Sequence, residues 1–491
     1  MAGIGFELKK LFSATGILSR LRAYGYTGMV TAGPMLLGVS FLLTISAVAK
    51  WAGVSEADTD LMVSIITYSL LGSMMHTSIF SMVMTRFVAD LLYAGKDEDI
   101  LPSLEGVLWF ILPTGAVLWV VFLFFSGLSV RLCFLVFVLF MELLTVWTQM
   151  NYLSAIKDYK GIVMSYVAAI LTSTATAFIG TYLAGGSLEV MMFGIVMGYG
   201  VMMAVDMALL YRFFPNSNQR HFDFLPWFDE YRELVIISFF TNVGLFSHLV
   251  IAWFSSIGRC IKGLFYAAPQ HDIAALFAFM TILITTINFV VSVEVNLYPK
   301  YRKYYDLFNG KGSIVEIEQA ESEMLTVLEH ELIYTARRQL YATAIMLSVG
   351  LVVLSRLPLG FDAMMEGYFR ILCVGYGAYA VGNVIIMILM YFTDYRDTLT
   401  ATLIFAILST AGCLFSLRFE MRFYGFAFAF ASIIYLVAGI WMLASFTKRL
   451  PYHILSTQPM LAEPKYGIAT RLYEKILEKE KKYLTGREVR Q

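Results

Sequence analysis

Closely spaced acidic residues are the first feature of this sequence that could carry chemistry. Asp58-Thr59-Asp60 places two carboxylates two residues apart, a spacing that can chelate one divalent ion and so hold a nucleotide sugar. The alternative interpretation is a group of acids at a helix N-terminus, where the helix dipole favours negative charge. The sequence contains no Walker phosphate loop, metal-binding His pair or nucleophile elbow. We therefore expect no enzyme active site, no cofactor and no metal site.

Ionisable side chains within long apolar segments are the second candidates, because a charge at lipid depth is costly and by default faces a cavity or a partner. Glu142 lies near the middle of such a segment and is the leading candidate for ion coupling or a substrate path. His76 and His248 are candidate protonation sites, although lone histidines more often make structural hydrogen bonds. An ion pair with Asp90, four residues on, is the alternative for Arg86. The full set of path or coupling candidates is Glu142, Asp206, Glu294, Arg86, His76, His248 and Asn383.

The composition places these residues in a membrane protein. The chain has 491 residues, of which 59% are hydrophobic and 15% charged, and its mean hydropathy is +0.71. Soluble domains are about 45–50% apolar and about 25% charged. A bilayer core needs about 20 helical residues per span, and the apolar runs here are continuous, which favours helices over a β-barrel. The fold class is therefore all-α and polytopic, with about 12 transmembrane helices expected at 24–50, 61–85, 106–126, 130–153, 161–184, 188–213, 233–257, 271–297, 340–357, 368–392, 398–416 and 421–446.

The basic residues predict the orientation of these spans. With both termini inside, the cytoplasmic segments hold 28 of the 36 Lys and Arg residues. Residues 1–23 lack an apolar core followed by a small-residue cleavage site, so we expect no cleavable signal peptide. The four cysteines are scattered and predict neither a disulfide framework nor a zinc site. The expected location is the bacterial inner membrane, with several passes and cytoplasmic termini.

A polar stretch at 214–232 divides the expected spans into six and six, a layout typical of transporters with two helical halves. The expected organisation is an interfacial segment 1–23, a first six-helix bundle 24–213, a linker 214–232, a second six-helix bundle 233–447 and a cytoplasmic tail 448–491. Gly194 and Gly198 predict a close approach of two helices, and Pro113 predicts a bend within a span.

Two cytoplasmic segments could dock a partner. In the loop 298–339, Ser313 and Glu316 form a capping box that precedes an acidic helix, whose candidate docking residues are Glu318, Glu321 and Leu328. Simple extension of the ninth span is the alternative. The tail contains a basic amphipathic helix with candidates Arg471, Leu472 and Lys475, and such a helix binds either anionic lipid or a partner groove.

The opening residues carry a family resemblance. Residues 1–11 (MAGIGFELKKL), continuing through Tyr24-Gly25 to Ala32-Gly33-Pro34, closely resemble the start of the PelG family of Pel exopolysaccharide transporters. Residues 290–294 (VVSVE), the aromatic stretch Tyr298 to Tyr305 and the acidic helix also look like that family.

This resemblance implies membership of the superfamily of polysaccharide flippases and multidrug exporters, with two six-helix bundles around a central cavity. The implied activity is export of a nascent amino-sugar-rich polysaccharide from the cytoplasm for biofilm matrix formation. The implied partners are a PelF-like cytoplasmic glycosyltransferase and PelD-like and PelE-like membrane proteins, besides polysaccharide and membrane lipid, and no nucleic acid.

Two other functions stay open at this point. One is a flippase for lipid-linked oligosaccharide or an ion-coupled small-molecule exporter. The other is a membrane scaffold that anchors and activates the glycosyltransferase without conducting anything.

Overall fold

A computed structural model of the chain describes residues 37–156, 159–215, 217–218, 220–310, 312–356, 361–456 and 465–488. Within these ranges, 11 helices are long and apolar enough to cross a membrane, and a shorter apolar helix runs over Leu37–Trp51. The 11 helices coincide with the second to twelfth expected spans, which confirms an all-α multi-pass protein. Of the first expected span, only residues 37–50 are described. The segment 1–23 and Gly33-Pro34 lie outside the described residues.

The chain divides into two compact units. The first, here called the α3–α8 unit, consists of the described parts of Phe41–Phe239, Lys262–Phe265 and Ser456–Gln491. The second, the α10–α18 unit, consists of the described parts of Met1–Ser40, Phe240–Ile261 and Tyr266–Leu455. The arrangement as two six-helix bundles stays a prediction.

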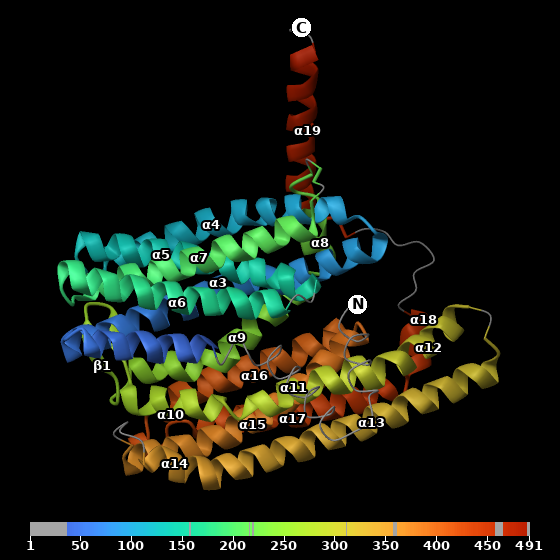
Figure 1. The fold of residues 1–491 in the computed structure, drawn as a ribbon. Helices are drawn as coiled ribbons and strands as arrows, with labels where there is room; N and C mark the ends of the chain where they lie inside the picture. Colours follow the sequence, from blue (N-terminus) through green and yellow to red (C-terminus); the bar gives the residue numbers. More distant parts are fainter. Residues whose placement is uncertain are drawn as a thin grey trace, which may run out of the picture. The chain divides into compact units, whose positions relative to one another are not determined.

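The α3–α8 unit is built from helices that run side by side (Figure 1). They are α3 (Glu56–Ala94), α4 (Ile100–Phe124), α5 (Val130–Ile156), α6 (Tyr159–Ala184) and α7 (Leu188–Phe213), followed by the short α8 (Leu225–Glu230) and, from the tail, α19 (Ile468–Glu488). α3 has 39 residues, about 58 Å, and so exceeds a hydrocarbon core of about 30 Å.

Local chemistry accounts for the start of α3 and the packing of α6 on α7. Ser55 caps α3, and its Oγ accepts a hydrogen bond from the Asp58 backbone N–H at 3.1 Å, so the acidic residues occupy a helix N-terminus. Among the described residues, no group of His, Cys, Asp and Glu is placed to hold a metal ion. A Cβ on Gly198 would lie 2.7 Å from the Ala169 carbonyl oxygen, so glycine lets the two helices touch, as predicted. α4 continues as one helix through Pro113.

The expected polar linker 214–232 is packed against α3 and α4 up to residue 231, and Arg232 begins the next helix; its part 214–231 is called the 214–231 segment below. Trp227 Nε1 donates to Asp90 Oδ2 at 3.1 Å, and His221 Nδ1 lies 3.3 Å from Glu105 Oε2. Opposite the turn at His221, α4 carries Gly106, where a Cβ would lie only 1.8 Å from the His221 carbonyl oxygen. The segment therefore belongs to the folded core of its unit.

The α10–α18 unit surrounds α15 (Ala363–Tyr391), the most buried of its candidate spans. Side chains with at most 2% exposure form its core, among them Phe369, Leu372, Phe405, Phe428 and Tyr435. The other elements are α9 (Arg232–Trp253, from Phe240 on), α10 (Pro269–Phe279), α11 (Ile282–Val290), a π-helix (Val291–Leu297), α12 (Tyr298–Asn309), α13 (Ile314–Ile345), a second π-helix (Met346–Gly350), α14 (Leu351–Arg356), α16 (Tyr395–Ser416), α17 (Phe426–Thr447) and α18 (Leu450–Ser456). A hairpin of β1 (Arg259–Lys262) and β2 (Phe265–Ala267) connects α9 and α10.

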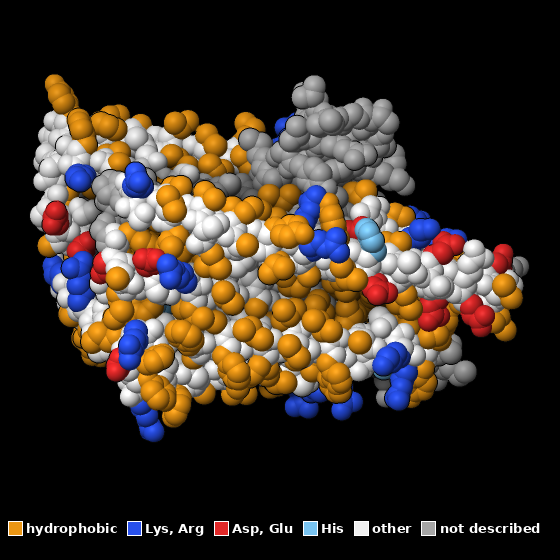
Figure 2. Space-filling model, turned by 90° about the horizontal axis from the view of Figure 1, so that it is seen from below, with side chains coloured by type: hydrophobic (Ala, Val, Ile, Leu, Met, Phe, Trp, Pro, Cys, Tyr) orange, Lys and Arg blue, Asp and Glu red, His pale blue; other side chains and the backbone are white. Residues whose placement is uncertain are grey.

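The acidic helix is an extension of the ninth span. The expected capping box is present, with Ser313 Oγ accepting from the Glu316 N–H and Glu316 Oε2 accepting from the Ser313 N–H. From there the chain stays helical for 43 residues to Arg356. Its later part exposes apolar side chains suited to lipid, including Leu340, Ile345, Val349, Val352 and Val353. Figure 2 shows hydrophobic side chains across the middle of one face, with acidic side chains gathered toward its two ends.

The tail helix α19 is capped by a residue of the 214–231 segment. Asp229 Oδ2 accepts hydrogen bonds from the backbone N–H groups of Gly467 (3.1 Å) and Thr470 (2.7 Å), and from the Thr470 hydroxyl (2.6 Å). Tyr473 adds a hydrogen bond from its hydroxyl to Asp223 at 3.0 Å. Partial burial alone would raise the pKa of Asp229, but the hydrogen bonds from Thr470, Ala469 and Gly467 outweigh it and hold the pKa below its usual value.

Replacing Asp229 by alanine is expected to loosen α19, because the substitution removes the acceptor that caps its first turn. We expect hydrogen–deuterium exchange across α19 to become about fivefold faster, the ratio produced by about 1 kcal/mol. Asp229→Asn keeps an acceptor but loses the charge, so its exchange rate across α19 should lie between those of the wild type and Asp229→Ala. In the wild type the capping contribution is full above the ordinary pKa of Asp and is lost as the pH falls through the lowered value. Equal exchange of wild type and Asp229→Ala at pH 7 would contradict this role.

Candidate functional site

The carboxylic candidates inside the α3–α8 unit, and the polar groups near them, lie on α5, α6 and α7. Glu142 of α5 faces Gly200 of α7, where a Cβ would lie 3.1 Å from Glu142 Oε1. Within the described residues, the buried Glu142 Oε2 has no hydrogen-bond partner. Two turns along α5, Gln149 Nε2 donates to the Met203 carbonyl at 3.1 Å. The side chain of Asp206 is fully buried on α7, within electrostatic range of Tyr166 on α6. The unit therefore holds two carboxylic side chains at candidate lipid depth.

His76 and Arg86, two further candidates on α3, make local contacts. His76 Nε2 lies 3.0 Å from Thr114 Oγ1 and 3.2 Å from the Ile111 carbonyl on α4, which is the structural hydrogen bonding considered as the alternative. Arg86 pairs with Asp90 at 3.1 Å, and Asp90 also accepts from Trp227. These contacts join α3 to its neighbours.

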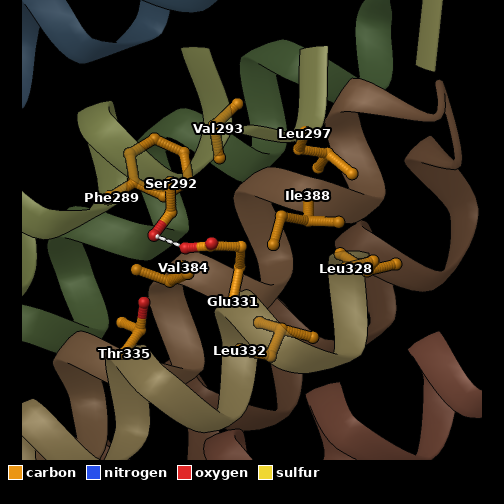
Figure 3. Close-up of a pocket in the computed structure, with 10 residues that line it drawn as sticks. All are labelled: Phe289, Ser292, Val293, Leu297, Leu328, Glu331, Leu332, Thr335, Val384 and Ile388. Atoms are coloured by element: carbon orange, nitrogen blue, oxygen red, sulfur yellow. Dashed lines mark hydrogen bonds between the residues drawn. The ribbon is translucent and has the colours of Figure 1, made fainter. Parts of the chain in front are cut away.

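A small pocket in the α10–α18 unit is built around Glu331 of α13 (Figure 3). Glu331 Oε2 accepts a hydrogen bond from Ser292 Oγ, and its Oε1 accepts one from Asn296 Nδ2 at 2.7 Å. Both donors belong to the π-helix Val291–Leu297, whose wider turn shifts the helix face relative to α11. Thr335 and apolar side chains complete the pocket, the latter being Phe289, Val293, Leu297, Leu328, Leu332, Val384 and Ile388. The π-helix thus aims two donors at one carboxylate in an otherwise apolar setting.

A chain of hydrogen bonds continues from this pocket between α11 and α13. Asn288 Nδ2 donates to Thr335 Oγ1 at 2.7 Å, and Asn288 Oδ1 accepts from Arg338 Nη1 at 3.1 Å. One turn further, Thr285 donates to Gln339. Asn288, Thr335 and Gln339 are all buried, so paired polar groups join the two helices.

His248 belongs to a second buried cluster of the same unit, which contacts α15 at Tyr376, about two turns before the pocket residue Val384. His248 Nδ1 lies 3.4 Å from His271 Nε2, and His248 Nε2 lies 3.0 Å from the Tyr376 hydroxyl. The His248 ring also contacts Phe428, with 4.4 Å between ring centroids. Only His248 was a candidate from the sequence. His271, which directly follows Pro269-Gln270 at a helix start, was missed because 23 residues and a hairpin separate the two histidines.

The remaining candidates are not brought together by the structure. Asn383 is half-buried on α15, and Glu294 lies in the π-helix, although its side chain is outside the described residues. Glu318 is exposed on α13, and Glu321 lies beside Tyr304 of α12. Leu328 is 3% exposed and lines the Glu331 pocket, so it offers no surface to a partner in this structure. On α19, the exposed residues include Arg471, Leu472 and Lys475.

Solved structures similar to this chain are membrane transporters. An outward-facing multidrug resistance MATE family transporter of the MOP superfamily matches with a TM-score of 0.59 and 12% identity, covering 90% of this chain and 98% of that one. A mutant of the Vibrio cholerae MATE transporter VcmN gives a TM-score of 0.57 at 12% identity, covering 91% and 98%. A MOP superfamily transporter from Pyrococcus furiosus gives 0.53 at 11% identity, covering 87% and 95%. These likenesses show the fold.

The family comparison covers most of the sequence. No curated protein matches the chain. Residues 1–455 match the family model PelG, described as "Putative exopolysaccharide Exporter (EPS-E)". The likeness in fold to transporters of the MOP superfamily agrees with this match. The chain therefore belongs to the PelG family.

Proposed function

We propose that this chain exports an amino-sugar-rich exopolysaccharide of the Pel type across the bacterial inner membrane for the biofilm matrix. The observation that carries the proposal is the family match over residues 1–455. The transporter fold supports it, because similar chains in that superfamily move substrates across a bilayer. In this proposal the chain forms no glycosidic bond itself, and the polymer is supplied by a separate cytoplasmic glycosyltransferase.

The proposed orientation has both termini in the cytoplasm, in agreement with the distribution of basic residues. The extension of α13 beyond its apolar part and the tail helix α19 then lie on the side where the polymer is made. We propose them as docking elements for a PelF-like glycosyltransferase and for PelD-like and PelE-like membrane proteins. Glu318 on α13, and Arg471, Leu472 and Lys475 on α19, are exposed and suited to such contacts.

Reconstitution with the partner synthase tests the proposal. Proteoliposomes would contain this chain, with the synthase and its sugar nucleotide supplied outside. We expect labelled polymer that resists an added glycoside hydrolase until detergent opens the vesicles. Polymer that stays fully sensitive to the hydrolase in the presence of this chain would overturn the proposal.

A scaffold function is the second candidate, because α19 is held on the 214–231 segment and exposes most of its residues from Ile468 to Lys479. A scaffold predicts faster polymer synthesis in the presence of this chain, with no protected polymer in the lumen. Removal of residues 465–491 should then abolish the stimulation and co-purification of the synthase. An exporter instead predicts that vesicles with the complete chain hold polymer protected from the hydrolase, even when the rate of polymer synthesis equals that without the chain.

A further inference from the structure

With one additional proton, three of the four ring nitrogens of the His248–His271 pair would each carry an N–H that faces an acceptor, namely His248 Nδ1, Asp272 Oδ1 and the Tyr376 oxygen. Both rings are buried, with 3% and 1% exposure, and their facing nitrogens are 3.4 Å apart. In the contact between the rings one nitrogen donates and the other accepts, so a neutral pair uses a single N–H there. Within the described residues, His271 Nδ1 has no hydrogen-bond partner, but Asp272 Oδ1 lies 3.9 Å away.

Asp272 supplies the negative charge for this proton and is itself firmly held. Its carboxylate accepts from Trp253 Nε1, 3.0 Å from either oxygen, and from the Ala268 backbone N–H at 3.0 Å. The Asp272 side chain is 29% exposed, whereas His271 is buried beneath it. Asp272 thus lies between the pair and the surface of the unit at the start of α10.

Uptake of the proton would change the contacts of three helices. Protonated on both nitrogens, His271 of α10 would donate through Nε2 to His248 and through Nδ1 to Asp272. A charged hydrogen bond is about 2.7–2.9 Å long, so the present 3.9 Å separation would shorten by about 1 Å. With its Nδ1 accepting from His271, His248 of α9 would donate through Nε2 to Tyr376 of α15, whose hydroxyl hydrogen must then point elsewhere.

Neighbouring groups limit the pair to one proton. Two imidazolium ions in contact would repel each other in a setting that excludes water. Asp272 provides the compensating carboxylate that directly faces the pair. The other titratable groups packed around the cluster are Tyr368, Cys373, Tyr376 and Tyr379 of α15, together with Asp362 and Tyr424, which face Tyr368.

We propose that His248 and His271, with Asp272 as counter-ion, form a binding site for one proton whose occupancy is coupled to polymer export. The coupling rests on the proposed exporter function, whereas the proton site itself does not. Proton binding draws His271 Nδ1 and Asp272 Oδ1 together at the start of α10 and makes His248 Nε2 the donor to the Tyr376 hydroxyl of α15, whichever of these two groups donates in the neutral pair. The site therefore converts a proton gradient into repacking of the α10–α18 unit.

Nuclear magnetic resonance of the full chain in lipid nanodiscs tests the site without any transport. The six histidines are labelled with ¹⁵N, and His248→Gln and His271→Gln identify the signals of the pair. Between pH 8.5 and 5 we expect the pair to gain one proton in a single step. In Asp272→Asn, uptake should require a solution more acidic by about 1 pH unit or more, because the counter-charge is gone. The matched control His453→Gln, on α18, should leave the step unchanged.

A pair that stays neutral down to pH 5, or gains two protons, would overturn the site. Coupling is tested in the reconstituted vesicles, where a pH gradient should accelerate export by the wild type and not by His271→Gln. Export by the wild type without any response to the gradient would overturn the coupling and leave the site standing. No export by the wild type at all would refute the exporter function, while the resonance measurement would still decide the proton site.

Discussion

Gly106→Ala is expected to release the 214–231 segment from α4. The new Cβ would lie 1.8 Å from the His221 carbonyl oxygen and 2.8 Å from its carbonyl carbon, and a backbone group cannot rotate away as a side chain can. Alanine gains about 1 kcal/mol over glycine in a helix. Overpacking costs about 1–3 kcal/mol or more, and here the clash is with the main chain, so the clash should win. Release of the segment should break the ring contacts that Phe224 and Trp227 make with Phe87.

Limited proteolysis measures this effect. We expect cleavage within 214–231 to become at least about tenfold faster, as a loss of about 1.4 kcal/mol would give, together with a lower thermal unfolding temperature. Gly367→Ala is the matched control, because this helical glycine of α15 has nothing within 4 Å of the added Cβ. If the Gly106→Ala chain is cleaved within 214–231 at the same rate as the wild type, the segment is held mainly by other contacts.

The packing of this segment was not predictable from composition. Its Pro, Asn, Arg and Asp residues indicate a linker between two halves, and the candidate spans α7 and α9 do lie on either side of it. The aromatic residues Phe222, Phe224 and Trp227 are spread among the polar ones and give no regular pattern. Their partners Phe87 and Phe110 lie on other helices more than 100 residues earlier, so only the fold shows that they meet.

Features that depend on local sequence were predictable. Hydropathy located the second to twelfth spans, because a bilayer imposes a minimum apolar length on each helix. The capping box at Ser313 and the close approach at Gly198 were also recognised, since each depends on residues within one turn. The His248–His271 contact and the Glu331 pocket depend instead on the pairing of distant helices. Ser292 and Asn296 are four residues apart and share a helix face by ordinary spacing, but that spacing could not show that this face meets Glu331, which lies 39 and 35 residues later on another helix.

Glu142→Gln is expected to reduce export strongly while leaving the protein as stable as before or more stable. Within the described residues, the carboxyl oxygen Oε2 is buried without a hydrogen-bond partner, an arrangement that costs folding free energy whenever the group is charged. Glutamine has nearly the same shape and fits the space left by Gly200, but it can neither bind nor release a proton. A costly group of this kind is best explained by a functional role.

Export into reconstituted vesicles and thermal unfolding of the same preparations separate the two effects. We expect export to fall at least about tenfold, equivalent to about 1.4 kcal/mol in activation free energy, while the unfolding temperature stays equal or rises. Glu189→Gln is the matched control, because this glutamate is exposed in the first turn of α7, and it should change neither quantity. If Glu142→Gln exports normally and unfolds at a higher temperature, the carboxyl has no role in coupling. A fall in both export and unfolding temperature would instead assign Glu142 to the packing of α5 against α7.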